Sequence, residues 1–150
     1  MSDYIEIKID SKEVEHKLQE NAKKSSNLKP LMKNIAGIFA SAAEDNFAEE
    51  GRPDKWIDLS EVTKKQRKKI GKSPGQILQV TGQLASSVNT YYDEDSAIIG
   101  SNLAYAAIHQ LGGQAGKNKK VTILARPYLK LTDDDLEEII KYIKTNFVID

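Results

Sequence analysis

The strongest pattern of apolar residues along the chain begins near Pro30. Apolar side chains recur there every three or four positions and would form one wide stripe on a helix: Leu31, Ile35, Ile38, Phe39, Ala42, Ala43 and Phe47. Proline is well suited to the first turn of a helix, and Gly51 with Pro53 would stop it. The pattern therefore predicts one long helix from about Pro30 to Phe47.

Two further segments carry helix signals. Thr132 is placed to cap a final helix with an apolar stripe of its own: Leu136, Ile139, Ile140, Ile143 and Phe147. Asp58 or Glu61 could cap a shorter helix that continues through Ile70 and is ended by Gly71. Both helices are amphipathic, so each should pack one face against a core.

Alternation of apolar and polar residues predicts strands elsewhere. Tyr4–Ile9 alternates strictly and should form a half-buried strand, followed by a first helix whose apolar positions are Val14, Leu18 and Ala22. Val88–Tyr92 and Ala97–Ile99 predict two strands joined by a hairpin connection at Asp93–Ser96.

A short helix is predicted over Leu103–Leu111, ended by Gly112 and Gly113. Gln114–Lys120 is rich in glycine and lysine and predicts a mobile loop, and Val121–Leu124 then predicts a short strand. The whole order of elements predicts a single α+β domain over residues 1–150: a small antiparallel sheet with helices packed on it, including the long second helix and the C-terminal helix.

Composition narrows the possible functions. The 150 residues include 22 basic and 22 acidic side chains, so the formal net charge is zero, which argues mildly against nucleic acid as the main partner. The absence of cysteine excludes disulfides, thiol catalysis and thiolate zinc sites. No apolar stretch approaches the roughly 20 residues that a membrane-spanning helix needs.

Few residues suggest chemistry. His16 lies in a charged segment that favours a solvated side chain, and the position four residues after His109 is a glycine rather than a metal ligand. The acidic run Asp133–Glu138 fits the first turns of a helix, where the helix dipole favours carboxylates. We therefore predict no enzymatic activity, no cofactor and no metal; a hydrolase with a non-standard site is the less favoured reading.

The densest basic run is the stretch from Lys64 to Lys72. On a helix, its basic residues would crowd one side: Lys64, Lys65, Arg67, Lys68, Lys69 and Lys72. Such a face could bind phosphates or an acidic partner, although a solvated helix face is the favoured interpretation. No aromatic residue is interleaved with the lysines, so stacking on single-stranded nucleic acid has no support. Nucleic-acid binding through this face remains the alternative function.

The middle and end of the chain carry a series of short motifs. In order, they are Trp56-Ile57-Asp58-Leu59 with Thr63, Thr81-Gly82-Gln83-Leu84, Ile99-Gly100-Ser101, Tyr105-Ala106-Ala107-Ile108-His109-Gln110-Leu111-Gly112-Gly113, and Ala125-Arg126-Pro127-Tyr128-Leu129. Each piece is common alone, but this order and spacing resembles the phage virion morphogenesis family, which includes tail completion proteins of the Mu G and P2 S type. The resemblance covers about residues 30–147.

The resemblance implies a structural protein that completes the phage tail or joins it to the head, and it implies no reaction. The implied partners are tail tube or head–tail connector proteins, together with further copies of the chain in a ring on the tail. There would be no membrane partner. The implied location is the virion, at the tail or the head–tail junction, and the bacterial host cytoplasm during assembly.

Two sets of residues are expected to carry these roles. The set expected at subunit or partner interfaces is Lys64, Lys65, Lys68, Lys69, Gly112, Gly113, Lys117, Lys119, Arg126, Asp133 and Asp134. The set of motif residues expected mainly to hold the fold is Trp56, Leu59, Thr63, Thr81, Gly82, Leu84, Tyr105, Ala106, His109, Pro127 and Leu129. In the fold set, Thr81 is expected to cap a helical turn, and Gly82 to allow a close approach of the backbone.

Overall fold

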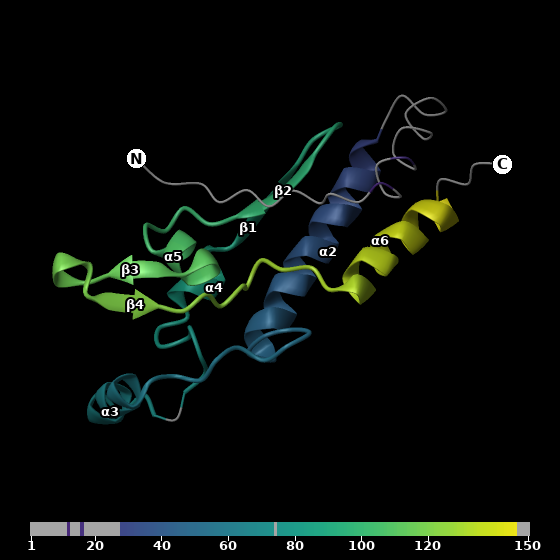
Figure 1. Ribbon diagram of the computed structural model, residues 1–150. Coiled ribbons are helices and arrows are strands. Elements are labelled where there is room, and N and C mark those ends of the chain that lie inside the picture. Colours follow the sequence, from purple (N-terminus) through teal and green to yellow (C-terminus); the bar gives the residue numbers. More distant parts are fainter. Residues whose placement is uncertain (1–11, 13–15, 17–27, 74, 147–150) are drawn as a thin grey trace.

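Figure 1 shows a computed structural model of the chain, which describes residues 12, 16, 28–73 and 75–146. The described elements follow one another as α2 (Lys29–Ala48), α3 (Glu61–Lys69), α4 (Gln83–Ser87), β1 (Asn89–Tyr92), β2 (Ala97–Gly100), α5 (Ala106–Leu111), β3 (Gly113–Ala115), η1 (Lys117–Lys119), β4 (Val121–Ile123) and α6 (Asp133–Asn146). The predicted strand Tyr4–Ile9 and the helix expected after it lie outside the described residues, apart from residues 12 and 16.

The α+β class is confirmed, with a different arrangement of strands. Instead of one small sheet, the described residues form two separate two-stranded antiparallel sheets, β1–β2 and β3–β4. The hairpin β1–β2 packs along α2 with α6 also against that helix, and β3–β4 lies beside α5 away from α6 (Figure 1). The long helix is therefore the element against which most of the core is assembled.

The predicted long helix is confirmed, with its proline in the first turn. One face of α2 is buried along its whole length and includes all seven residues of the predicted stripe. The helix ends where Gly51 adopts a φ of 111° and its N–H donates to the carbonyl of Asn46 over 2.9 Å. A Cβ on Gly51 would lie 2.5 Å from the backbone nitrogen of Trp56, so only glycine fits this bend without a shift.

The caps of the two other helices were predicted with mixed success. The side chain of Ser60, and not of Asp58 or Glu61, caps α3 by accepting a hydrogen bond from the backbone N–H of Thr63. Asp58 points its carboxylate to the N–H of Leu59 instead. The prediction for Thr132 is confirmed, because its hydroxyl accepts from the N–H of Asp135 while the Asp135 carboxylate accepts from the N–H of Thr132.

The segment Gln114–Lys120 is not an irregular loop. Its first residues belong to β3, which pairs with β4 in the register Gly113↔Ile123 and Ala115↔Val121. The turn between the two strands is the short 3-10 segment η1, with φ positive at Asn118 and Lys119. The strand expected at Val121–Leu124 is confirmed as β4, one residue shorter.

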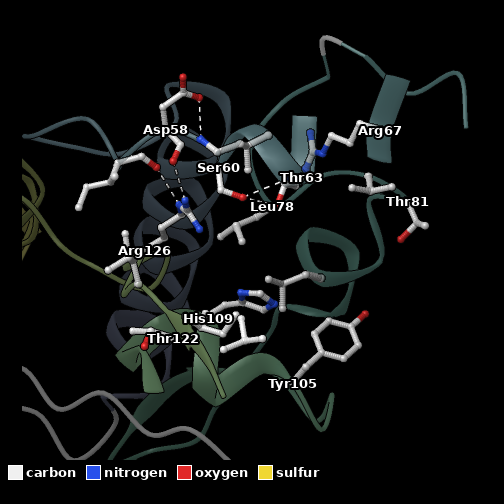
Figure 2. Close-up of a pocket in the computed structure, with 17 residues that line it drawn as sticks. Asp58, Ser60, Thr63, Arg67, Leu78, Thr81, Tyr105, His109, Thr122 and Arg126 are labelled. Carbon is white, nitrogen blue, oxygen red and sulfur yellow. Dashed lines mark hydrogen bonds between the residues drawn. The ribbon is translucent and has the colours of Figure 1, made fainter. Parts of the chain in front are cut away.

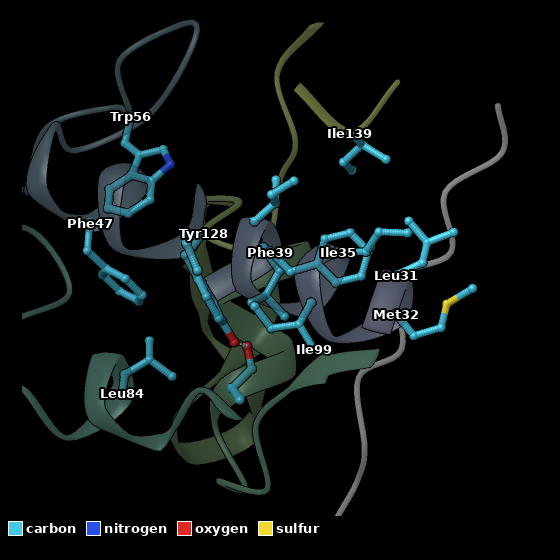
Figure 3. Close-up of a cluster of buried hydrophobic side chains, with 14 of the residues drawn as sticks. Leu31, Met32, Ile35, Phe39, Phe47, Trp56, Leu84, Ile99, Tyr128 and Ile139 are labelled. Carbon is cyan, nitrogen blue, oxygen red and sulfur yellow. Dashed lines mark hydrogen bonds between the residues drawn. The ribbon is translucent and has the colours of Figure 1, made fainter. Parts of the chain in front are cut away.

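An aromatic cluster joins the end of α2 to the segment that follows β4 (Figure 3). The ring of Phe47 contacts Trp56 edge-on, with centroids 5.9 Å apart, and Tyr128 at 5.3 Å. Tyr128 is fully buried and donates its hydroxyl to the carbonyl of Ala106, while Trp56 donates its indole N–H to the carbonyl of Pro127. Each aromatic polar atom is therefore satisfied inside the core.

A buried polar network fastens the same segment to α2. Asn46 is fully buried and donates through Nδ2 to the carbonyls of Tyr128 and Lys130, each over 2.9 Å. Its Oδ1 accepts from Nε of Arg52, whose Nη2 donates to Asp135 at 3.0 Å. The network joins α2, the residues after it, the segment 127–130 and the start of α6.

Candidate functional site: a cleft built from the motif residues

A cleft of about 590 Å³ opens between α3, α5 and β4 (Figure 2). Its walls come from the 57–60 segment, α3, the 78–84 segment, the start of α5, and the 121–126 segment. Nine residues of the quoted motifs line it: Ile57, Asp58, Leu59, Thr63, Thr81, Leu84, Tyr105, His109 and Arg126. Motif residues that are up to 69 positions apart in the sequence, from residue 57 to residue 126, therefore meet at one surface feature.

The rim of the cleft exposes an unusual amount of apolar surface. Five large apolar residues that line the cleft are exposed to solvent: Ile57, Val80, Tyr105, Val121 and Leu124. Single exposed apolar side chains are ordinary on a protein surface, but a group of them around one concave site is typical of a binding surface. The cleft is thus suited to binding a partly apolar partner.

Arg126 is held in place along one wall. Its Nε donates to the carbonyl of Ile57 over 2.9 Å, and its Nη2 donates to the carbonyl of Asp58 over 3.0 Å (Figure 2). These two bonds join the 125–129 motif to the motif that begins at Trp56. Partial burial lowers the pKa of Arg126, with the Asp58 carboxylate acting in the opposite direction. The guanidinium stays charged at any ordinary pH.

Arg67 lines the cleft and is only 5% exposed. Its Nη1 donates to the carbonyl of Gln76 over 2.7 Å, whereas its buried Nε has no hydrogen-bond partner. Within the described part of the chain, no carboxylate forms an ion pair with this guanidinium. A buried positive charge with an unused donor therefore lies at the cleft.

His109 contributes a third nitrogen-bearing group. Its ring lies edge-on to Tyr105 with centroids 5.9 Å apart, and its Nδ1 is buried without a partner. Burial lowers the pKa of His109 below 6.5, and the positive charge of Arg126 lowers it further. The ring is therefore neutral at neutral pH, and the positive charge of the cleft comes from its two arginines.

The hydroxyl groups of the cleft have structural tasks. The Ser60 hydroxyl caps α3 and also shares a hydrogen bond with the Thr63 hydroxyl at 2.9 Å, and Thr81 accepts from the N–H of Gln83. Among residues 12, 16, 28–73 and 75–146, no group of three or more histidine, aspartate or glutamate side chains could hold a metal ion. Within those same residues, no helix is long and apolar enough to cross a membrane.

Arg126 lies in the cleft wall, and the other residues predicted at interfaces are spread over three further places. Lys65, Lys68 and Lys69 are exposed on α3 beside the cleft, but Lys64 already pairs with Asp58 at 2.8 Å and with Glu61. Gly112 and Gly113 join α5 to β3, and the exposed Lys117 and Lys119 lie at the turn between β3 and β4. Asp133 and Asp134 are exposed at the start of α6, away from α3 (Figure 1).

The motif residues expected to hold the fold divide into two groups. Trp56, Leu84, Ala106 and Leu129 are buried in the core. The remaining ones lie partly or wholly at the cleft or beside it: Leu59, Thr63, Thr81, Gly82, Tyr105, His109 and Pro127. The motif series therefore supplies both core positions and a surface feature.

The interpretation of Gly82 needs correction. Gly82 has a φ of 73°, but a Cβ there would meet nothing within 4 Å, so it serves the turn before α4 and not a close approach. Close approach occurs at Gly112, where a Cβ would lie 2.9 Å from the backbone nitrogen of Ala125. Gly112 thus lets the end of α5 lie directly against the 123–125 segment.

Several residues of the site could not be singled out from the sequence. Ile57, Val121 and Leu124 were not expected to share a surface, and the buried network of Asn46 and Arg52 was missed. Gln110 lies within a quoted motif, and its Oε1 accepts from the N–H groups of both Tyr128 and Leu129. The only sequence signal for this structural role of Gln110 was its position as a polar residue within a largely apolar motif.

Comparison with known families decides the broader identity. The model of the phage virion morphogenesis family matches residues 9–147, which is most of the chain. The chain belongs to the phage virion morphogenesis family. The resemblance inferred from the motif series is thereby confirmed, and the match extends further toward the N-terminus than the motifs do.

Curated relatives agree with this assignment. The chain is 39% identical over 144 residues to the "Mu-like prophage FluMu G protein 2" of Haemophilus influenzae, covering 95% of this chain and 96% of the relative. It is 34% identical to "Mu-like prophage FluMu G protein 1" of the same organism, over 91% of this chain and 90% of the relative. It is 36% identical to the "Putative capsid assembly protein G" of Escherichia phage Mu, over 73% of each chain. No solved structure matches the chain.

Proposed function

We propose that this member of the family is a structural protein that completes the phage tail or joins it to the head, and that it catalyses no reaction. The observation that carries the proposal is the convergence of nine motif residues on a cleft with an exposed apolar rim. Such a surface is suited to binding another protein. Membership of a morphogenesis family supports the partner being a virion protein, such as a tail tube or connector protein.

The chemistry of the cleft supports binding over catalysis. The Ser60 and Thr81 hydroxyls accept from backbone N–H groups of their own chain, and Arg126 donates to backbone carbonyls of its own chain. We expect protein purified without added metal to contain no stoichiometric zinc or manganese when it is measured by elemental analysis. A stoichiometric metal would contradict the proposal and revive the hydrolase interpretation.

The proposal includes self-association into a ring on the tail. A closed ring uses head-to-tail contacts in which one patch meets a different patch. The basic face Lys64–Lys72 and the acidic start of α6, Asp133–Glu138, are of opposite charge on a chain of zero net charge. Exposed ion pairs contribute only about 0–1 kcal/mol each, so we expect a monomer or small oligomer in dilute solution. Sedimentation at low and high salt tests this, and a large ring that ignores salt would contradict it.

The proposed location is the virion, at the tail or the head–tail junction, with assembly in the bacterial host cytoplasm. Deleting the gene from the phage or prophage that carries it should leave normal heads, with tails that are unfinished or unjoined, in electron micrographs of the lysate. Supplying the gene from a plasmid should restore whole virions. Because one relative is named a putative capsid assembly protein, malformed heads would instead favour a role in the capsid and contradict the tail proposal.

Nucleic-acid binding by the α3 face is the competing function. Lys64 is engaged by two carboxylates and Arg67 points into the protein, so four lysines of the run remain for phosphates: Lys65, Lys68, Lys69 and Lys72. A gel shift that weakens steeply with salt would support this function, because phosphate contacts release counterions. We expect no shift at physiological salt.

A further inference from the structure

The hairpin β1–β2 carries an acidic tip. Asp93, Glu94 and Asp95 are exposed there in sequence. Oδ1 of Asp93 accepts from the N–H groups of Asp95 and Ser96 at 2.8 and 2.7 Å, and from the Ser96 hydroxyl. These bonds fix the turn, so Glu94 and Asp95 are presented on a defined scaffold. Tyr92, the last residue of β1, is 40% exposed directly beside them.

The cleft has the complementary character. Arg67 is a buried guanidinium that has no carboxylate partner among the described residues and whose Nε donates to nothing. A buried charge without a counterion is unfavourable, and a carboxylate that reached it would relieve that cost. Around it, the exposed apolar rim includes Val121 and Leu124. The cleft therefore fits a ligand that combines carboxylates with an aromatic or aliphatic side chain.

The size of the cleft also fits such a ligand. Its volume of about 590 Å³ falls within the roughly 300–1,000 Å³ of sites that enclose small ligands. A hairpin tip of a few side chains matches that space, whereas a whole helix or strand pair does not. Among the described residues, the β4 strand at the rim pairs with β3 alone, so its other edge has no partner strand there.

We propose that the acidic tip Tyr92–Asp95 of one copy docks into the cleft of a second copy, with the carboxylates facing Arg67 and Arg126 and Tyr92 against the apolar rim. The tip is acidic and the cleft is basic, and each of the two surfaces has apolar side chains next to its charged ones. The inference rests on the proposed function only in that both involve self-association. It names a surface pair different from the basic face of α3 and the acidic start of α6.

The contact must join two molecules. Figure 1 shows the tip of β1–β2 near the start of α2, while α3, α5 and β4, which surround the cleft, lie at the other end of the structure. Hydrogen bonds from Asp95 and Ser96 lower the pKa of Asp93, and the positive charge of Lys29, in the first turn of α2, lowers it further. This effect of Lys29 agrees with a tip that lies near the start of α2. Because the tip and the cleft are different surfaces, the interface is head-to-tail and can repeat from copy to copy until a ring closes.

Cross-linking gives a direct test, because the chain has no cysteine of its own. Glu94→Cys protein would be mixed with Leu124→Cys protein and treated with a short bis-maleimide over a range of concentrations. The matched control is Leu111→Cys, which replaces the same residue type at a site outside the cleft that is more exposed, 71% against 45%. We expect the Glu94–Leu124 mixture to give at least fivefold more covalent dimer than the Glu94–Leu111 mixture. Equal yields would overturn the proposal.

A mixing experiment tests the head-to-tail character. Glu94→Lys/Asp95→Lys destroys the tip and keeps the cleft, and Leu124→Glu does the reverse. Each variant alone should sediment as a monomer at concentrations where the wild type associates, while the two mixed should form a 1:1 dimer and nothing larger. Misfolded variants could not rescue each other in this way. No dimer in the mixture, or unchanged association of either variant alone, would overturn the proposal.

The two proposals can fail separately. If gene deletion leaves complete virions but the cross-link forms selectively, the tail function is wrong and the docking stands. If deletion blocks tail completion but the cross-link yields are equal, the tail function stands and the docking is wrong. Glu44→Lys/Asp54→Lys, which changes the same charge at exposed positions away from both surfaces, should behave as wild type in sedimentation.

Discussion

Asn46 offers the sharpest test of how the cleft is held. Its side chain makes three hydrogen bonds: two from Nδ2 to the carbonyls of Tyr128 and Lys130, and one from Arg52 to its Oδ1. The change Asn46→Ala removes all three and leaves the Tyr128 carbonyl and the Arg52 donor without these partners in a buried place. At a net contribution of about 1 kcal/mol for each bond, the change should lower the free energy of unfolding by about 3 kcal/mol.

Two smaller terms adjust this figure. Alanine favours the helix over asparagine by roughly 0.5 kcal/mol, whereas the small cavity left by the amide acts in the other direction. We therefore keep about 3 kcal/mol, which corresponds to a melting temperature lower by about 10 °C for a chain of this size. Urea unfolding followed by the fluorescence of Trp56 measures the loss, because this only tryptophan is buried beside Phe47.

Asn34→Ala is the matched control. Asn34 lies on the same helix and is half-buried, and within the described part of the chain its side chain makes no hydrogen bond. The change should alter stability by less than about 0.5 kcal/mol. A loss below about 1 kcal/mol for Asn46→Ala would refute the reasoning, because it would mean that the 128–130 segment is held without the amide.

Three further outcomes follow from the structure. Gly51→Ala should destabilise the protein by at least about 2 kcal/mol more than Gly71→Ala. Both positions have a positive φ, but only at Gly51 would the new Cβ meet backbone atoms. Equal losses of stability in urea unfolding would contradict this prediction. Burial lowers the pKa of His109 in the folded protein below the 6.5 of the unfolded chain. Near and below pH 6.5 the unfolded state therefore binds more protons than the folded state, so stability should fall as the pH drops below about 6.5. His109→Gln should flatten the curve between pH 7 and pH 5 in thermal melts, and an unchanged slope would show that another group titrates. Limited trypsin digestion should cut first after Lys117, Lys119 or Lys120, which are exposed at the η1 turn. First cuts inside α2 would contradict the expected mobility of the η1 turn.

Local signals in the sequence were sufficient for much of the secondary structure. The stripe from Leu31 to Phe47 specifies a helix because its spacing matches one helical face, and Gly51 stops it because the bend needs a positive φ. The acidic connection Asp93–Ser96 predicted a hairpin that the structure confirms. The order of the motifs identified the family, because the series compares many positions of the sequence at once. This comparison required no knowledge of where those positions lie in space.

The sequence could not show which residues meet. Ser60 rather than Asp58 caps α3 because the choice depends on the path of the chain into the helix, and Asp58 is drawn instead toward Lys64. The 114–120 segment has weak strand signals by itself, and it forms β3 because β4 is available to pair with it.

The cleft was likewise invisible in the sequence, because its walls come from segments far apart along the chain. Those segments are brought together by long-range bonds such as Arg126 to the carbonyls of Ile57 and Asp58, and Asn46 to the carbonyl of Tyr128. Local patterns decide which elements form because their causes lie within a few residues. The site belongs to the tertiary structure because its charges and apolar surface become one feature only when those elements are packed.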